Sequence, residues 1–146
     1  MTWLGDGGED DVLAFDTGPG NALIDDWMLG RTGRARDEDG RAGVAGRVHE
    51  DVVRFYLNHS YFAALPPKSL DRYDFKLDPA LNLSAADGAA TLTAFTAACV
   101  RASEAFLPGA PAAWIACGAR VVGHLVGALR QPRCDPRVDG VGFDGA

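Results

Sequence analysis

The stretch Asp16–Asn21, D-T-G-P-G-N, constrains the fold most strongly, because it can continue neither a strand nor a helix. Pro19 has no amide hydrogen to donate, and the glycines on either side of it adopt backbone angles that other residues avoid. The short apolar run Asp11–Phe15 precedes this corner, and apolar residues at spacings of three and four follow it from Leu23 to Met28. The sequence therefore predicts a buried strand, a sharp corner and then a helix that begins near Asn21.

Further strands and helices are expected along the rest of the chain. A solvated loop is expected over Gly30–Gly46, including the acids Asp37–Asp39, and a helix over Val48–Asn58. The irregular segment Tyr61–Phe75 follows, because Pro66-Pro67 rules out a regular helix there. A helix is then expected from Ser84 to Phe106, with one apolar face at spacings of three and four formed by Leu92, Phe95, Cys99, Ala102 and Phe106. A buried strand over Ala113–Gly118 and a helix over Val122–Leu129 come last. Ser84 is expected to cap its helix, with Asp87 in the capping-box position. This order indicates an α/β or α+β chain with a parallel pair of strands.

The composition indicates one folded domain and argues against several classes of function. The chain has 146 residues, 47% of them hydrophobic, and a formal net charge of −6, so residues 1–146 are interpreted as a single domain. No cluster of cations is available to neutralise nucleic-acid phosphates. The three cysteines and three histidines lack the spacing of a metal site, and no apolar run approaches the ~20 residues that span a membrane. We expect no metal-ligating residues, no nucleic-acid or membrane partner, and a cytoplasmic location.

Asp16 is the first candidate for a chemically active side chain, because it stands where the predicted strand ends. Ligands of open α/β sheets gather at such strand ends. Gly18 and Gly20 permit close approach of a ligand, and the following helix directs free N–H groups to the same place. Asp16 could act there as a general base on a polar sugar. The alternative is that Asp16 only caps the turn.

Two other groups of residues also have two interpretations. Cys117–Arg120, C-G-A-R, follows the second predicted strand and is either a nucleotide-facing turn or an ordinary one. Lys68 and Arg72, beside the double proline, either meet a carboxylate or phosphate or are surface charges.

Four blocks of sequence, in order, carry a resemblance to one family. They are Phe15–Trp27, Tyr61–Phe75, Asp87–Ala98 and Trp114–Leu129, and Val138–Ala146 resembles the start of a fifth. Together they resemble the anhydro-N-acetylmuramic acid kinases, and the D-T-G-P-G-N and P-P-K-S-x-x-R patterns are specific to that family. The resemblance covers nearly the whole chain.

This resemblance implies one lobe of the two-lobed, ribonuclease H-like α/β fold shared by sugar kinases, actin and Hsp70. It implies ATP-dependent, hydrolytic opening of 1,6-anhydro-N-acetylmuramic acid and phosphorylation of its O6, which yields N-acetylmuramic acid 6-phosphate in peptidoglycan recycling. Asp16 would be the base that activates the water. The implied sugar-binding residues are Thr17, Gly18, Pro19, Gly20, Asn21, Lys68 and Arg72, and the implied ATP-binding residues are Cys117, Gly118, Ala119 and Arg120, with Mg²⁺ carried on the phosphates.

The chain also departs from the family pattern. The family's opening phosphate loop, G-T-S-x-D-G-x-D, has no counterpart, and its C-G-G-G-R-x-N motif is replaced by C-G-A-R-V-V-G. Residues 1–146 are therefore expected to form the C-terminal lobe, truncated at both ends. Two hypotheses remain, a lobe of a working kinase and a non-catalytic remnant or scaffold. For the chain alone we expect no kinase activity, and association either as a homodimer or with a separate N-terminal lobe.

Overall fold

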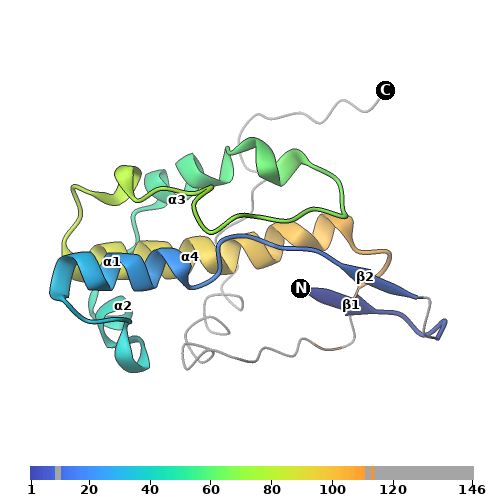
Figure 1. Cartoon of the computed structure of the whole chain (residues 1–146), viewed down its shortest axis with the longest axis horizontal. Coiled ribbons are helices and arrows are strands. Elements are labelled where there is room, and N and C mark those ends of the chain that lie inside the picture. Colours follow the sequence, from blue (N-terminus) through green and yellow to red (C-terminus); the bar gives the residue numbers. More distant parts are fainter. Residues whose placement is uncertain (9–10, 111–112, 114–146) are drawn as a thin grey trace.

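A computed structural model describes residues 1–8, 11–110 and 113 of the chain (Figure 1). The helix predicted over Val122–Leu129, the turn Cys117–Arg120 and all but the first residue of the strand predicted over Ala113–Gly118 lie outside the described residues. The strands and α-helices of the described part are β1 (Thr2–Leu4), β2 (Val12–Ala14), α1 (Ala22–Thr32), α2 (Arg41–Ala45), α3 (Glu50–Leu57) and α4 (Ala85–Ala102). Short 3₁₀ turns cover Glu38–Gly40, Ser60–Ala63, Asp78–Ala80 and Ser103–Phe106.

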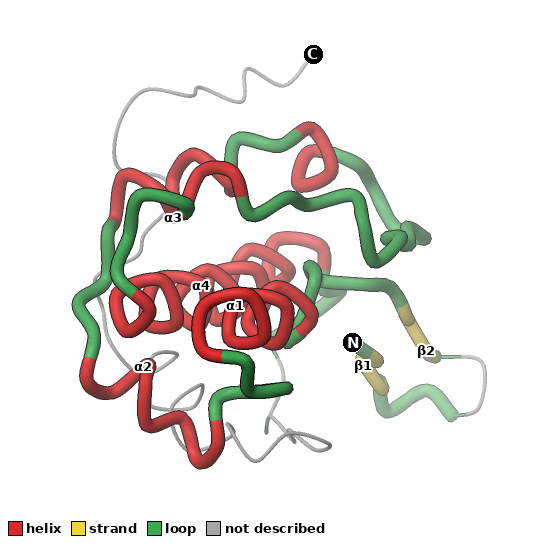
Figure 2. The backbone as a smooth tube through the Cα atoms, turned by 60° about the vertical axis from the view of Figure 1, so that its left-hand side comes forward, coloured by secondary structure: helices red, strands yellow, loops and turns green. Residues whose placement is uncertain are grey.

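The long helix α4 lies at the centre of the described part, and the other helices pack around it. Figures 1 and 2 show α1 alongside α4, with α3 and α2 on opposite sides of this pair. The predicted apolar stripe of α4 is the core, since Leu92, Phe95 and Cys99 are all buried. Tyr56 of α3 stacks on Phe95 with ring centroids 4.7 Å apart, and burial raises the pKa of the Tyr56 hydroxyl to about 12. The helix that the spacing predicted is thus confirmed.

The start of α4 is also as predicted, with one difference. The Ser84 hydroxyl accepts a hydrogen bond from the Asp87 amide at 3.1 Å, as an N-cap serine should. The Asp87 carboxylate does not complete a capping box. It accepts instead from the amide of Arg47 at 2.8 Å, so it joins the chain before α3 to the first turn of α4.

The described sheet is a two-stranded antiparallel hairpin, in which Trp3 pairs with Leu13. The strand expected within Asp11–Phe15 is confirmed as β2, but its predicted burial is wrong, because Val12 and Ala14 are exposed and Leu13 is only half-buried. Strand β1 was not predicted. The predicted parallel pair of strands includes the strand over Ala113–Gly118, nearly all of which lies outside the described residues. The fold of the described part is mixed α/β with a small sheet, in agreement with the expected class.

The prediction that Gly30–Gly46 is a solvated loop is wrong in three respects, because α1 extends into this range, α2 lies within it and Asp37 is buried. Helix α1 runs on to Thr32, where Gly33 ends it in the left-handed conformation with φ 72°. Asp37 is not solvated but is only 6% exposed, and its carboxylate accepts hydrogen bonds from the amides of Ala42 and Gly43 at 2.9 and 2.8 Å. These bonds satisfy the free amides at the start of α2, which explains how a glycine-rich segment still forms a helical turn.

Within residues 1–8, 11–110 and 113, no helix is both long and apolar enough to cross a membrane.

Candidate functional site around Asp16

Asp16 lies directly after β2, at the beginning of the corner that leads into α1. Its side chain is exposed, while the neighbouring Phe15 is buried. The main-chain amide of Asp16 donates to the carbonyl of Lys68 at 3.1 Å. Its carboxylate oxygen Oδ2 accepts from the amide of Leu70 at 3.0 Å. The irregular segment around the double proline is thus hydrogen-bonded to Asp16, just after the end of β2.

The Gly-Pro-Gly corner needs both of its glycines, for different reasons. A β-carbon on Gly18 would lie 2.6 Å from the sulfur of Cys99, so the corner packs directly on α4 at this point. Gly20 has φ 60°, in the left-handed region that costs other residues about 1–2 kcal/mol. Its carbonyl accepts a hydrogen bond from the Thr96 hydroxyl at 2.9 Å. The corner is therefore held against α4 at two positions, and Asp16 precedes it.

The remaining corner residues, Thr17, Pro19 and Asn21, are half-buried. Asn21 precedes α1 in the N-cap position, but its side chain makes no capping hydrogen bond. The Asn21 amide group is therefore available to a ligand without loss of a helix cap.

Lys68 comes close to Asp16, but its ammonium group is occupied within the protein. Its Nζ donates to the carbonyl of Tyr61 at 3.2 Å and lies 4.7 Å from the ring centroid of Tyr61 and 4.2 Å from that of Phe106. Burial lowers the pKa of the Lys68 amine, and attraction to the ring faces favours the charged form. Lys68 thus holds the irregular segment against the 3₁₀ turn that follows α4, and a sugar would contact Lys68 only at the edge of this aromatic group.

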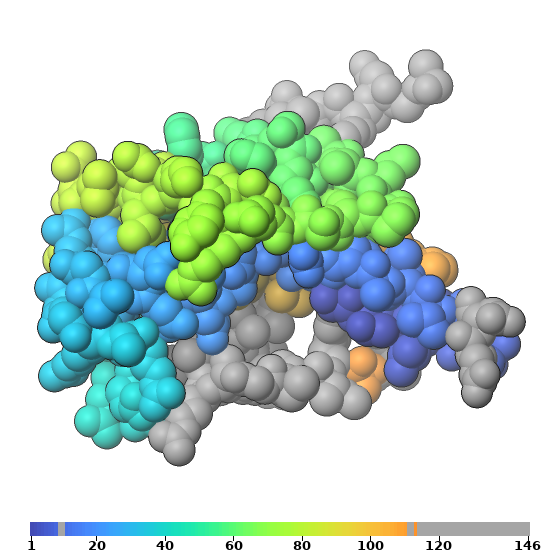
Figure 3. Space-filling model, in the orientation of Figure 1, coloured from blue at the N-terminus to red at the C-terminus, as the bar shows by residue number. Residues whose placement is uncertain are grey.

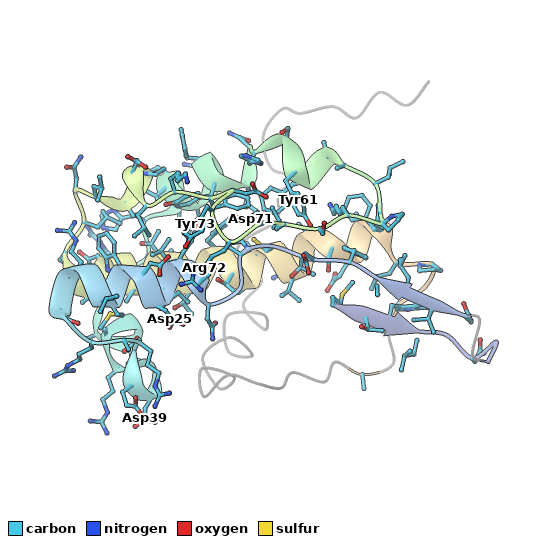
Figure 4. The ribbon with its side chains drawn as sticks, viewed as in Figure 1. Asp25, Asp39, Tyr61, Asp71, Arg72 and Tyr73 are labelled. Atoms are coloured by element: carbon cyan, nitrogen blue, oxygen red, sulfur yellow. The ribbon has the colours of Figure 1, made fainter. Side chains whose placement is uncertain are left out.

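Arg72 lies beside α1 and is paired with an acid of that helix (Figure 4). Its Nη2 donates to Oδ1 of Asp26 at 2.6 Å. Burial raises the pKa of the neighbouring Asp25 carboxyl, and the charge of Arg72 opposes that shift. The structure therefore places Arg72 on the same side of the segment as α1, with one of its donors already used.

The described residues include no group of three or more His, Cys, Asp or Glu side chains that could hold a metal ion. The four residues expected to face ATP, Cys117–Arg120, lie outside them. Of the predicted site residues, the structure thus brings together Asp16, the corner Thr17–Asn21 and Lys68, and it places Arg72 further along α1.

Two contributors to the site could not be read from sequence spacing. Tyr61 donates its hydroxyl hydrogen to the main-chain carbonyl of Asp16 at 2.6 Å, and Leu70 contributes its amide. Figure 3 shows the green segment, to which both residues belong, packed against the blue segment that leads into α1. Contacts between residues 45 and 54 positions apart leave no periodic signal in the sequence.

Comparison with known proteins identifies the family to which this arrangement belongs. The described residues form a mixed α/β segment in which the Asp16 carboxylate follows a strand. Asp16 precedes a corner with a glycine on each side of Pro19. A family described as anhydro-N-acetylmuramic acid kinase matches residues 7–127, and the chain belongs to this family.

Individual relatives give the same result. The chain is 48% identical over 149 residues to a protein named anhydro-N-acetylmuramic acid kinase from Rhodospirillum rubrum, a match that covers 99% of this chain and 39% of that protein. A protein of the same name from Caulobacter vibrioides is 56% identical over 113 residues, covering 77% of this chain and 30% of that protein. The match to a third, from Paramagnetospirillum magneticum, is 45% over 151 residues, covering 99% of this chain and 42% of that protein. The chain therefore spans roughly two fifths of the length of the first and third of these relatives.

Proposed function

We propose that this chain supplies the sugar-binding and water-activating part of an anhydro-N-acetylmuramic acid kinase, as the second lobe of a sugar kinase, actin and Hsp70-like fold in the cytoplasm. The observation that carries the proposal is the placement of Asp16. Its carboxylate is exposed at the end of β2, and Oδ2 accepts a hydrogen bond from Leu70. A general base needs this combination of access to the reacting water and a defined orientation.

In the proposed reaction, Asp16 accepts a proton from a water molecule as the water oxygen attacks C1 of the 1,6-anhydro sugar. The C1–O6 bond breaks, the electron pair stays on O6, and O6 takes the γ-phosphoryl group that ATP supplies. The products are N-acetylmuramic acid 6-phosphate and ADP. Oδ2 already accepts a hydrogen bond from the Leu70 amide, which lowers its basicity, so in this proposal Oδ1 receives the proton.

The corner would hold the sugar in place for this attack. The Asn21 side chain has no capping bond to give up, and Gly18 and Gly20 carry no side chain that would keep a sugar ring away from the backbone. Thr17 and Pro19 would form the adjacent wall. Lys68 and Arg72 would contact polar substituents of the sugar from the irregular segment.

Magnesium would be carried on the nucleotide phosphates, as the family resemblance implies. Phosphoryl transfer depends mainly on positioning and charge neutralisation around the phosphates. The contribution of the described residues is therefore to bind and orient the sugar, and Cys117–Arg120 would contact the nucleotide.

A calorimetric titration of the chain with 1,6-anhydro-N-acetylmuramic acid tests the sugar site without any need for turnover. We expect binding by the unmodified chain, and a loss of about five- to tenfold in affinity for Asn21→Ala, the effect of one hydrogen bond. Asn58→Ala, which changes the same side chain at the C-terminal end of α3, is the matched control and should bind normally. No binding by the unmodified chain, or equal losses for the two variants, would contradict the proposal.

Kinase activity is tested by placing this chain in the context of a longer relative. In a chimera, it would replace the 149 aligned residues of the Rhodospirillum rubrum protein, and phosphorylation of the sugar would be followed with ATP and Mg²⁺. Asp16→Asn should lower turnover by about 100-fold or more, as loss of a general base does. Asp51→Asn, an exposed acid of α3, should leave turnover unchanged. A chimera that binds the sugar but does not phosphorylate it would favour a non-catalytic lobe.

A further inference from the structure

Three hydrogen bonds join the end of β2 to the irregular segment, and all three involve Asp16. The Asp16 amide donates to the carbonyl of Lys68 at 3.1 Å, and the Leu70 amide donates to Oδ2 of Asp16 at 3.0 Å. The third is the shortest, from the Tyr61 hydroxyl to the main-chain carbonyl of Asp16 at 2.6 Å. Figure 4 shows Tyr61 on the segment that lies over the connection from β2 to α1. Asp16 is thus fixed by hydrogen bonds at its amide, its carbonyl and its carboxylate.

We propose that Tyr61 is a positioning residue for Asp16. By binding the Asp16 carbonyl, it sets the backbone so that Oδ2 meets the Leu70 amide and Oδ1 faces the water to be activated. This inference rests on the proposed function for its meaning in catalysis. The geometry that it describes is a property of the chain without any ligand.

Tyr61 is itself held in place from two sides. The Lys68 ammonium group donates to the Tyr61 carbonyl at 3.2 Å and lies over its ring. The Tyr61 ring meets Phe62 edge-to-face with centroids 5.7 Å apart, and Phe62 in turn packs on Phe95 of α4 at 6.1 Å. The position of the hydroxyl is therefore tied to the hydrophobic core.

The Tyr61 hydroxyl must remain protonated to donate this hydrogen bond. Burial and the nearby negative charge of Asp16 both raise the pKa of the Tyr61 hydroxyl. Tyr61 is thus a neutral donor at physiological pH. A phenylalanine at this position keeps the ring and its contact with Phe62 and removes only the donor.

Amide hydrogen exchange, measured by NMR on the chain of 146 residues, tests the inference without substrate. In Tyr61→Phe, we expect the amides of Asp16 and Leu70 to exchange about tenfold faster, because the backbone of Asp16 is no longer fixed. The Leu70 amide proton should also shift upfield as its hydrogen bond to Oδ2 lengthens. The amide of Phe95 in α4 should be unaffected, which separates a local change from general destabilisation.

Tyr73→Phe is the matched control, because Tyr73 lies on the same irregular segment but is 66% exposed. It should leave the Asp16 and Leu70 amides unchanged. Equal effects of the two substitutions, or unchanged exchange in Tyr61→Phe, would overturn the inference. If Tyr61→Phe does not fold, Lys68→Met removes the donor that orients Tyr61, and the same two amides should again exchange faster; no change there would equally refute the inference.

A kinetic measurement links this geometry to function and separates the two proposals. In the Rhodospirillum rubrum chimera, Tyr61→Phe should lower kcat about tenfold and leave KM within about twofold, because it affects the base and not sugar binding. If Tyr61→Phe and Tyr73→Phe change kcat by the same factor, and KM by the same factor, a positioning role for Tyr61 is contradicted. If the unmodified chain binds no sugar, the proposed function fails, whereas the exchange experiment still decides whether Tyr61 orients Asp16.

Discussion

Gly18 packs directly against Cys99, so that the corner after β2 and the last turn of α4 are in van der Waals contact. A β-carbon on Gly18 would lie 2.6 Å from Sγ of Cys99 and 2.7 Å from its Cβ. Cys99 is buried, and burial raises the pKa of its thiol, so it is a neutral packing residue. This contact fixes the distance between the candidate base, two residues earlier, and the core.

We therefore expect Gly18→Ala to destabilise the chain by about 1–3 kcal/mol, the usual cost of an added methyl group in a packed interior. The substitution should also weaken sugar binding, because the corner must move away from α4 and takes Asp16 with it. Urea unfolding and calorimetric titration would measure the two effects.

Gly30→Ala is the control for this prediction. Gly30 lies inside α1, and apart from its chain neighbours and the backbone of its own helix no described atom lies within 4 Å of the added β-carbon, so alanine should stabilise the helix by about 0.5–1 kcal/mol. A Gly18→Ala chain as stable as the unmodified one would show that the corner does not depend on contact with Cys99.

Asp37 gives a second stability prediction, because its buried carboxylate supports the first amides of α2. Asp37→Ala leaves two donors without their acceptor and should cost about 1–2 kcal/mol, as loss of a helix N-cap does. Asp37→Asn keeps one acceptor oxygen, so its loss in free energy of unfolding should be smaller than that of Asp37→Ala. Asp39→Asn, at an exposed acid with φ 56°, should have little effect in the same urea titration. Equal stability of Asp37→Ala and Asp39→Asn would contradict the capping role.

Protonation of the Asp87 carboxylate should account for part of the loss of folding stability at acidic pH. The hydrogen bond from the Arg47 amide, and then the neighbouring Ser84 side chain, lower the pKa of the Asp87 carboxyl below its usual value of 3.8. A carboxyl with a lowered pKa in the folded state stabilises that state above its unfolded pKa. The contribution is thus complete above about pH 4 and is lost as the pH falls through the lower, folded value.

Asp87→Asn should remove this part of the acid dependence. Thermal unfolding between about pH 7 and pH 2.5 should show a smaller fall in Tm for the variant than for the unmodified chain. Asp6→Asn, at an exposed acid of the N-terminal hairpin, should leave the slope as it is. Identical slopes for all three chains would show that the Arg47–Asp87 contact is not maintained in solution.

Local sequence patterns were enough to predict α1, α3, α4 and β2. In α4, the spacing of Leu92, Phe95 and Cys99 and the capping serine are both local signals, and both are confirmed. The corner Asp16–Asn21 was predicted for the same reason, since Gly and Pro restrict the backbone directly.

The parts that were not predicted depend on contacts between distant residues. Helix α2 has five residues and no apolar periodicity, and the burial of Asp37 comes from the tertiary packing of α2 on α4. The three-residue strand β1 exists because it pairs with β2. Likewise, the contact of Tyr61 with Asp16 joins residues 45 positions apart, and no pattern within either block contains that information.

Arg72 carries the last prediction, because its ion pair with Asp26 has two interpretations with different consequences. If Arg72 contacts the sugar, as we propose, Asp26 only holds its guanidinium group beside α1 through one of its nitrogens. Arg72→Gln should then weaken sugar binding about tenfold or more, as loss of a charge-assisted hydrogen bond does. Asp26→Asn keeps the guanidinium group and should bind within about twofold of the unmodified chain.

The side chains of Arg72 and Asp26 are 52% and 39% exposed, and ion pairs at such partly solvated positions contribute little, so neither substitution should change the urea midpoint noticeably. This separates a binding effect from a loss of folding in the same samples. If Arg72→Gln and Asp26→Asn weaken sugar binding equally, the ion pair acts by holding the irregular segment against α1. If neither weakens it, Arg72 makes no contact with the sugar, and Lys68 and the Asp16–Asn21 corner remain as the proposed sugar-binding residues.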